Sequence, residues 1–342
     1  MLLAFGVVGM VLSEVFCWNM APLVEAAGRG PLHVGVAVAA AIAGYTLMFA
    51  VVLDLVHRWG VSDWLGVLLA GSIYGLINEG IFGETVFLPG PGPRVLGIWP
   101  IRAAFPALSW HPLIDFAFSV LVVGGICRGS AVVAERRVRP GDAIGAVVVG
   151  AVLAATSRLP WVRTALGGVD LPLWVQSFAV LFGSLALGCA VLNALRHPAD
   201  ALPLEVLGPR ARTVAWSVVG LAALLRALSL PDKLAIFPFV LLVAAHLLVL
   251  RFHTSPGRNG RQRSLSILRT CYPVRGRADP VKLAVLAGLA IVSFAIVRGV
   301  TSLPVLQVFA RPLGLLVVIN ATVYALLFPI IMTLRAALTR LR

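Results

Sequence analysis

Apolar runs, each about as long as a membrane is thick, recur along nearly the whole chain and constrain its fold more than any other feature. A helix needs roughly 20 predominantly apolar residues to cross about 30 Å of hydrocarbon. Of the 342 residues, 60% are hydrophobic and 12% are charged, and the mean hydropathy is +0.97. No stretch remains that is long enough for a soluble domain. The sequence therefore predicts an all-α, polytopic transmembrane helix bundle, with residues 1–342 forming one integral membrane domain.

Hydropathy predicts ten membrane-spanning helices. They cover residues 1–22, 33–56, 63–88, 110–127, 141–157, 172–195, 212–229, 234–251, 282–300 and 312–334. The fifth and seventh are only about 17 residues long, at the lower limit for a span, so an arrangement of eight spans stays open. The apolar run at the N-terminus has no basic segment before it, and we interpret it as the first helix and not as a signal peptide.

The basic residues of the predicted loops alternate with the spans. Nine of the 28 Lys and Arg residues fall in odd-numbered loops, and the remaining 19 fall in even-numbered loops and the C-terminal tail. The nine are Arg29, Arg94, Arg102, Arg158, Arg163, Arg226, Lys233, Arg298 and Arg311. Because cytoplasmic loops carry the excess of positive charge, this pattern predicts that both termini lie in the cytoplasm and that the protein spans the cytoplasmic membrane.

One predicted cytoplasmic loop, residues 251–282, is strongly basic. It holds eight Lys and Arg residues and a single acid, Asp279. Attraction to anionic lipid headgroups accounts for such a loop. The net charge of +14 is otherwise spread over short loops, without the basic and aromatic stripe typical of nucleic-acid binding, so no nucleic-acid partner is expected.

The chain lacks the short motifs that identify common enzymes and ATP-driven pumps. It contains no GxxxxGK[ST], HExxH, GxSxG or GxGxxG sequence. The four cysteines form no CxxC pair and are interpreted as ordinary thiols. No cofactor is expected, and the sequence resembles no family that we recognise.

Ionisable residues within the predicted spans are the remaining candidates for function, because charge is costly in hydrocarbon. In the third span, Gly71, Gly75 and Glu79 recur every four residues and so share one helix face that can pack closely on a neighbour. Asn78 adjoins Glu79. Glu84 lies five residues further on, about 140° around an ideal helix, so the two carboxylates share a pocket only if the helix loosens.

In the fourth span, His111 and Asp115 are also four residues apart. Since Pro112 suits the first turn of a helix and disfavours helix at the preceding residue, we predict His111 as the N-cap. The first span adds Glu14. Under the predicted orientation, all five ionisable residues lie in the outer half of the membrane, beneath an external loop rich in proline and glycine, residues 88–109. Arg94 and Arg102 of that loop are candidate charge partners.

Such a cluster can carry protons, bind a cation or supply an acid and a base. A metal site formed by His111, Asp115 and a glutamate is chemically conceivable but has only one histidine, and none is expected. The alternative is that these residues pair with one another or with backbone and only hold helices together.

Two functions fit. The first is a proton- or cation-coupled permease for a small solute, with Glu79 and Asp115 as coupling residues. The second is an intramembrane enzyme with a lipid or lipid-linked substrate at the outer leaflet, using His111 and Asp115 as acid and base. A third reading, a non-catalytic assembly subunit, also stays open. No internal repeat is visible in the sequence, which weighs weakly against a transporter built from repeats.

Overall fold

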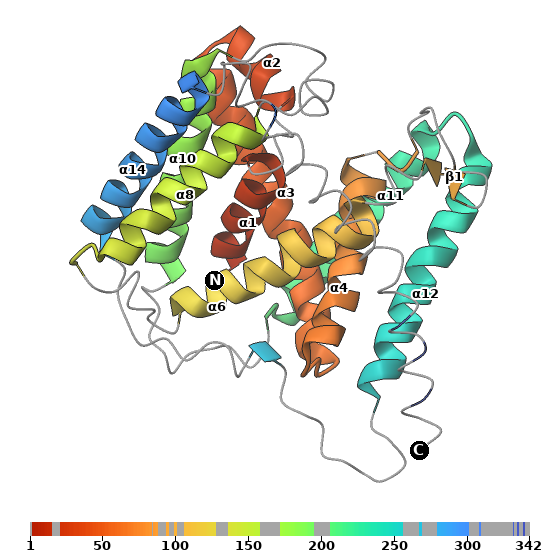
Figure 1. Ribbon diagram of the computed structural model, residues 1–342. Coiled ribbons are helices and arrows are strands. Elements are labelled where there is room, and N and C mark those ends of the chain that lie inside the picture. The colour runs from red at the N-terminus through yellow and green to blue at the C-terminus, as the bar shows by residue number, and fades with distance from the viewer. Residues whose placement is uncertain are drawn as a thin grey trace. The chain divides into compact units, whose positions relative to one another are not determined.

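The computed structural model describes most of the chain, and what it describes is almost entirely helical (Figure 1). The described residues are 2–15, 21–83, 85–87, 94–95, 99–100, 106–127, 136–157, 172–194, 206–255, 267–268 and 279–300, with the single positions 308, 331, 334 and 338. The tenth predicted span and most of the basic loop lie outside them.

The helices follow the predicted spans closely. They are α1 (Leu2–Met10), which continues as the π-helical segment η1 (Val11–Val15); α2 (Ala21–Arg29); α3 (Pro31–Arg58); α4 (Trp64–Leu76), which continues as the π-helical segment η2 (Ile77–Phe82); the π-helix η3 (Pro106–Ala117), which continues as α6 (Phe118–Cys127); α8 (Pro140–Thr156); α10 (Leu173–Ala194); α11 (Pro209–Ser229); η5 (Lys233–Ala235), which leads into α12 (Ile236–Thr254); and α14 (Pro280–Val300).

Two short elements differ from the prediction. The helix α2 occupies a stretch that was expected as a loop, and its exposed face carries the Glu25–Arg29 ion pair. Within the proline-rich loop 88–109, β1 (Arg94–Val95) and β2 (Trp99–Pro100) form a minimal antiparallel ladder in which Arg94 is opposite Pro100 and Val95 is opposite Trp99.

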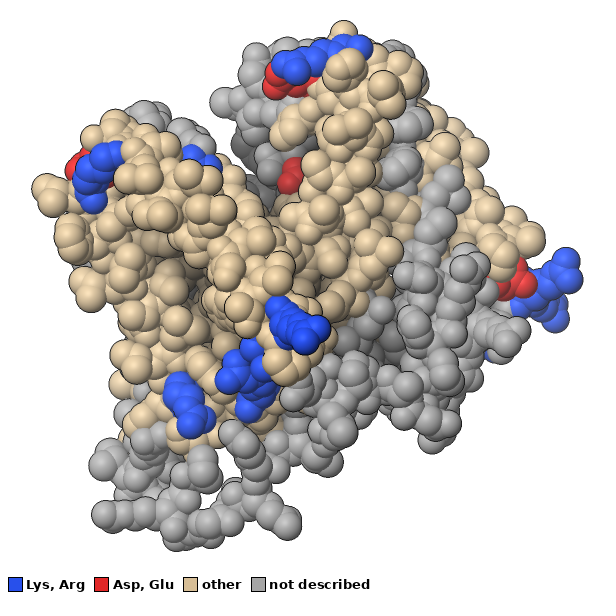
Figure 2. Space-filling model, turned by 180° about the vertical axis from the view of Figure 1, so that it is seen from behind, with Lys and Arg blue, Asp and Glu red and all other residues tan. Residues whose placement is uncertain are grey.

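Five of the described helices are long and apolar enough to cross a membrane: Pro31–Arg58, Trp64–Phe82, Pro209–Ser229, Lys233–Thr254 and Pro280–Val300. Of the two weakest predicted spans, the seventh is therefore long enough, whereas the fifth belongs with the shorter apolar helices. Charged side chains are few on the face drawn in Figure 2, where most described atoms belong to uncharged residues. This surface and the apolar helices are compatible with a membrane protein.

The chain divides into two compact units, with boundaries that fall inside α3 and α6. Unit 1 comprises Met1–Thr46, Val122–Ala201 and Pro273–Ile319, and unit 2 comprises Leu47–Leu121, Leu202–Tyr272 and Asn320–Arg342.

In unit 1, α14 packs between α8 and α10, and the three helices lie side by side in Figure 1. Gly150 of α8 lies directly against the backbone of Ala290, because a Cβ built on Gly150 would be 2.9 Å from the Ala290 carbonyl carbon. Ser293 donates to the carbonyl of Val147 at 2.7 Å. At the N-terminal ends of α8 and α14, Lys282 Nζ lies 2.6 Å from Asp142 Oδ2, and both side chains are buried. Lys282 is therefore not available to lipid headgroups, contrary to its assignment to the basic loop.

In unit 2, the described helices contact one another near both of their ends. At one end, His253 Nε2 lies 2.9 Å from Asp63 Oδ2, and the Ile267 amide donates to the carbonyl of Val61. At the opposite end, Arg226 Nε donates to the carbonyl of Ile81 at 3.2 Å, and Gly80 packs against the ring of Phe239.

Candidate intramembrane polar site

The face of α4 that carries Gly71 and Gly75 packs directly on η3, as the spacing of the glycines predicted. A Cβ on Gly71 would lie 2.6 Å from the Cα of Pro112, and one on Gly75 would lie 2.9 Å from the carbonyl carbon of Ala107. A side chain at either position would force the neighbouring backbone to shift. The helix backbones therefore touch, and this close approach brings the polar residues of the two helices together.

A π-helical turn places Glu79 at the end of this face. The Gly83 amide donates to the carbonyl of Asn78, five residues back, at 2.6 Å. This bond widens the helix over Ile77–Phe82, and π-helical turns are found often at functional sites. The carbonyl of Glu79 accepts from the amide of Val86 at 3.3 Å, so the chain that leaves the helix folds back over it.

The prediction that His111 caps a helix is wrong. The helix begins at Pro106, and both His111 and Pro112 lie inside it. A proline inside an α-helix removes a hydrogen bond and collides with the carbonyl four residues back. The π-helical geometry of η3 moves that carbonyl away, and it leaves the oxygen of Ala107, five residues before Pro112, against Gly75.

His111 lies between two carboxylates that come from different helices. Its Nε2 is 2.5 Å from Glu79 Oε1, and its Nδ1 contacts Asp115 Oδ2 one turn along η3. The site becomes more buried from Glu79 to Asp115: the side chains of Glu79, His111 and Asp115 are 13%, 5% and 0% exposed. Three of the predicted residues thus converge within hydrogen-bonding distance.

Aromatic rings close the site on one side. Phe49 of α3, Tyr74 of α4 and Phe116 of η3 form a cluster with ring centroids 4.7–5.6 Å apart, and the centroid of Tyr74 is 6.1 Å from that of His111. Asn78 Nδ2 lies 3.2 Å from His111 Nε2 and 3.4 Å from Nδ1, so its amide packs on the imidazole. The apolar rings lower the local dielectric and strengthen the charged hydrogen bonds.

The geometry allows a proton to move within the site. Each of the two contacts of His111 needs one proton between its nitrogen and the carboxylate oxygen. Two protons are therefore shared among three groups, either as an imidazolium between two carboxylates or as a neutral imidazole beside one carboxylic acid. Both arrangements have a net charge of −1, and passage between them requires only short shifts along existing hydrogen bonds. Uptake of one further proton from outside makes the site neutral.

The same geometry argues against a metal site formed by these residues. The two carboxylates contact opposite nitrogens of one ring, so they do not converge on a common point. Over the described part of the chain, no group of three His, Cys, Asp or Glu side chains is arranged to hold a metal ion.

The other predicted site residues lie elsewhere or outside the described residues. Glu14 belongs to unit 1, where Tyr45 donates its hydroxyl to Glu14 Oε1 at 2.6 Å. Arg94 lies in β1, while Glu84 and Arg102 are outside the described residues. The roles of Arg94 and Arg102 as charge partners stay predictions.

Sequence reasoning missed several long-range partners. Asp54 is fully buried and forms a two-pronged ion pair with Arg212, whose Nε and Nη2 lie 2.8 and 3.1 Å from its two oxygens. Arg58 is further away, at 3.8 Å. Arg298, assigned to an odd-numbered loop, is buried and donates to Gln176 Oε1 at 2.9 Å. Charge spacing in a sequence predicts only pairs within one helix. It gave no signal here, because the partners lie on separate helices.

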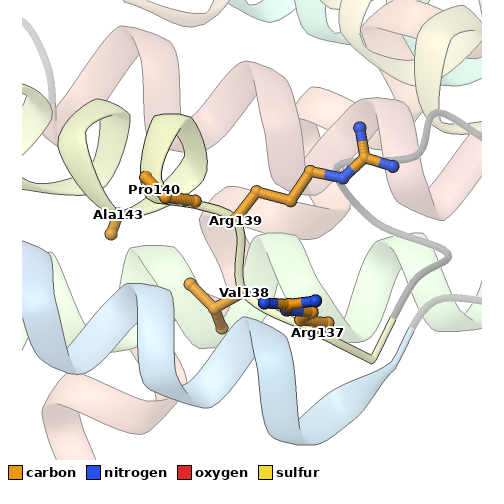
Figure 3. Close-up of a pocket in the computed structure, with 5 residues that line it drawn as sticks. All are labelled: Arg137, Val138, Arg139, Pro140 and Ala143. Atoms are coloured by element: carbon orange, nitrogen blue, oxygen red, sulfur yellow. The ribbon is translucent and has the colours of Figure 1, made fainter.

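A pocket at the start of α8 offers no comparable chemistry. Arg137, Val138, Arg139, Pro140 and Ala143 line it, as Figure 3 shows, and all come from one short segment. Both arginines are exposed. The buried polar groups of this protein are elsewhere.

Comparison with known proteins gives no further guide to function. No protein family matches the chain, and neither a curated protein nor a solved structure is significantly similar to it.

Proposed function

We propose that this membrane protein is a proton-coupled permease for a small solute, in which Glu79, His111 and Asp115 carry the proton. The observation that supports this function most directly is the imidazole of His111 between two carboxylates, buried where two helix backbones touch. Buried ionisable groups of this kind form the proton relays of pumps and transporters.

The gradient of burial gives the relay a direction. Protons enter at Glu79, the most exposed of the three, and pass through His111 to Asp115. Ser119, one turn beyond Asp115, is also buried, and its hydroxyl has no hydrogen-bond partner within the described residues. It extends the polar line along the helix toward the middle of the membrane.

We propose ten spans with both termini in the cytoplasm. The contacts within each unit support this topology, because each contact joins two helix ends that the topology assigns to the same side of the membrane. Asp63 with His253, and Asp142 with Lys282, join ends assigned to the cytoplasm. Arg226 with Ile81, and Arg298 with Gln176, join ends assigned to the outside. An error of one in the number of spans between two paired ends would place those two ends on opposite sides of the membrane.

The alternative is an enzyme that acts on a lipid at the outer leaflet. The Asp115–His111 pair favours it, because a carboxylate that orients an imidazole is common in acid and base catalysis. However, His111 Nε2, the nitrogen that would exchange a proton with a substrate in such an enzyme, contacts Glu79 instead. Lipid extracts from cells with and without the protein, and from cells with Asp115→Asn, decide the matter: identical lipids in all three exclude the enzyme.

Proton flux into vesicles tests the permease directly. The purified protein is reconstituted with a pH-sensitive dye inside the vesicles, and solutes from the main small-molecule classes are added under an imposed pH gradient. We expect at least one solute to accelerate proton entry, and we expect His111→Gln, Glu79→Gln and Asp115→Asn each to abolish the acceleration. The exposed residues His33 and Glu25 provide matched controls, His33→Gln and Glu25→Gln, which should behave as wild type. Solute-dependent flux that persists in all three site variants contradicts the assignment.

A further inference from the structure

The hydrogen bond between Glu14 and Tyr45 has the same construction as that between Glu79 and His111. Each glutamate lies in a π-helical segment at the end of an apolar α-helix, η1 after α1 and η2 after α4. Each is bonded to a ring-bearing side chain of a later long helix, 31 residues further on for Tyr45 and 32 for His111. The bond lengths are 2.6 and 2.5 Å.

A glycine that contacts the partner helix precedes each of the two glutamates by the same number of residues. Gly6 precedes Glu14 by eight residues, and Gly71 precedes Glu79 by eight. A Cβ on Gly6 would lie 2.8 Å from the amide nitrogen of Thr46, the residue directly after Tyr45. A Cβ on Gly71 would lie 2.6 Å from the Cα of Pro112, the residue directly after His111.

The residues just before the two glutamates also agree in character. Ser13 and Asn78 are both polar in otherwise apolar helices, and Ser13 is buried. An offset of 65 residues relates Gly6 to Gly71 and Glu14 to Glu79, and an offset of 66 relates Tyr45 to His111 and Thr46 to Pro112. The packing contact and the hydrogen bond of the first helix pair therefore correspond to those of the second, with a shift of one residue between the two helices of a pair.

We propose that the helix pair 2–15 with 31–58 and the helix pair 64–82 with 106–127 are two copies of one helical hairpin, and that Glu14 with Tyr45 is a second proton-binding site. The duplication rests on the contacts alone. The choice of a proton as ligand rests also on the proposed function, since it carries the chemistry of Glu79 over to Glu14. The sequence alone shows no such repeat.

The two sites differ in the side chain that contacts the glutamate, which is Tyr45 in the first and His111 in the second. A tyrosine hydroxyl donates one hydrogen bond and does not pass a proton on through a second nitrogen, as an imidazole does. The position that corresponds to Asp115 is Phe49, an apolar residue. On α3, no carboxylate therefore follows Tyr45 at the position where Asp115 follows His111, and the path from His111 to Asp115 along η3 belongs to the second copy.

Infrared difference spectra between acid and alkaline pH test the second site without any transport assay. A carboxyl group that gains a proton gives a C=O band, and its frequency reports on its hydrogen-bond donor. We expect Glu14→Gln to remove one such band that Glu79→Gln leaves in place. Tyr45→Phe, which keeps the ring but removes the donor, should shift the same band and no other. The exposed Glu25→Gln is the matched control and should leave both bands as in wild type.

The outcomes separate the second site from the proposed function. If Glu14→Gln, folded as judged by circular dichroism, gives the wild-type spectrum, or if Tyr45→Phe leaves the Glu14 band in place, the second site is disproved whatever the vesicles show. If the Glu14 band behaves as expected while vesicles show no solute-dependent proton flux, the second site stands and the permease falls.

Discussion

At the scale of single residues, most of the buried charge in the described part of the chain is neutralised by partners on other helices. Asp54 is fully buried, and Arg212 meets both of its carboxylate oxygens while also donating to the carbonyl of Leu207 at 2.8 Å. Lys282 and Asp142 form a second buried pair. Such pairs give little net stability when intact but are costly to break, because the remaining charge is left in an apolar surrounding.

We expect Asp54→Asn to destabilise the protein by on the order of 3 kcal/mol, because it leaves the guanidinium of Arg212, only 21% exposed, without its counter-charge. Thermal unfolding in detergent measures the loss. The double variant Asp54→Leu with Arg212→Leu should recover most of it, since neither charge then remains. A single variant as stable as wild type would show that the pair does not contribute.

Proton transfer within the candidate site gives a second residue-scale prediction. His111→Gln retains a polar side chain but offers no nitrogen that can both accept and release a proton, so proton flux should fall to the level of empty vesicles. Asp115→Glu retains the carboxylate, and we expect it to preserve part of the flux, whereas Asp115→Asn should preserve none. Equal flux in the two Asp115 variants would mean that this carboxylate does not take part.

At the scale of elements, the helix contacts depend on glycines that admit a neighbouring backbone. Gly6 meets Thr46, Gly71 meets Pro112, and Gly150 meets Ala290. The π-helical segments then set the direction of the polar groups: η2 presents Glu79, and η3 accommodates Pro112 without breaking the helix. Close packing and widened turns together build the site.

Replacement of these glycines should reveal the proposed duplication as matched effects. We expect Gly6→Ala and Gly71→Ala each to lower stability by about 1–3 kcal/mol, the usual cost of overpacking, because each added methyl group meets backbone that cannot move aside. Gly44→Ala on α3 is the control, since nothing lies within 4 Å of its Cβ position. Thermal unfolding compares the three. A neutral Gly6→Ala would argue that the first hairpin does not pack as the second does.

At the scale of the whole molecule, the order of spans is the property to test. We expect single cysteines at Arg137 and Ser255 to react with a membrane-impermeant maleimide only after cells are permeabilised, and those at Gly30 and Asp232 to react in intact cells. The background variant replaces the four native cysteines, Cys17, Cys127, Cys189 and Cys271. Labelling of all four sites from one side would overturn the alternation, and the reverse pattern would invert the orientation.

The sequence by itself determined that the chain is built of apolar helices, and it determined the positions of the described helices other than α2. Apolar runs and loop charges are local properties, so they predict helices wherever the chain must satisfy its backbone in hydrocarbon. The face formed by Gly71, Gly75 and Glu79 was also predictable, because helical periodicity fixes it without knowledge of the partner. The convergence of His111 and Asp115 with Glu79 was proposed from depth in the membrane, and only the structure brought the three to hydrogen-bonding distance.

Only the tertiary structure decided how the helices pair. The placement of His111 inside a helix depended on a π-helical turn, which has no reliable sequence signal. Asp54 with Arg212 and Arg298 with Gln176 join residues 158 and 122 positions apart, distances over which spacing along the chain carries no information. The repeat stayed hidden for the same reason: two apolar helices share few residue identities, and the contacts of Glu14 and Glu79 appear only when each helix lies against its partner.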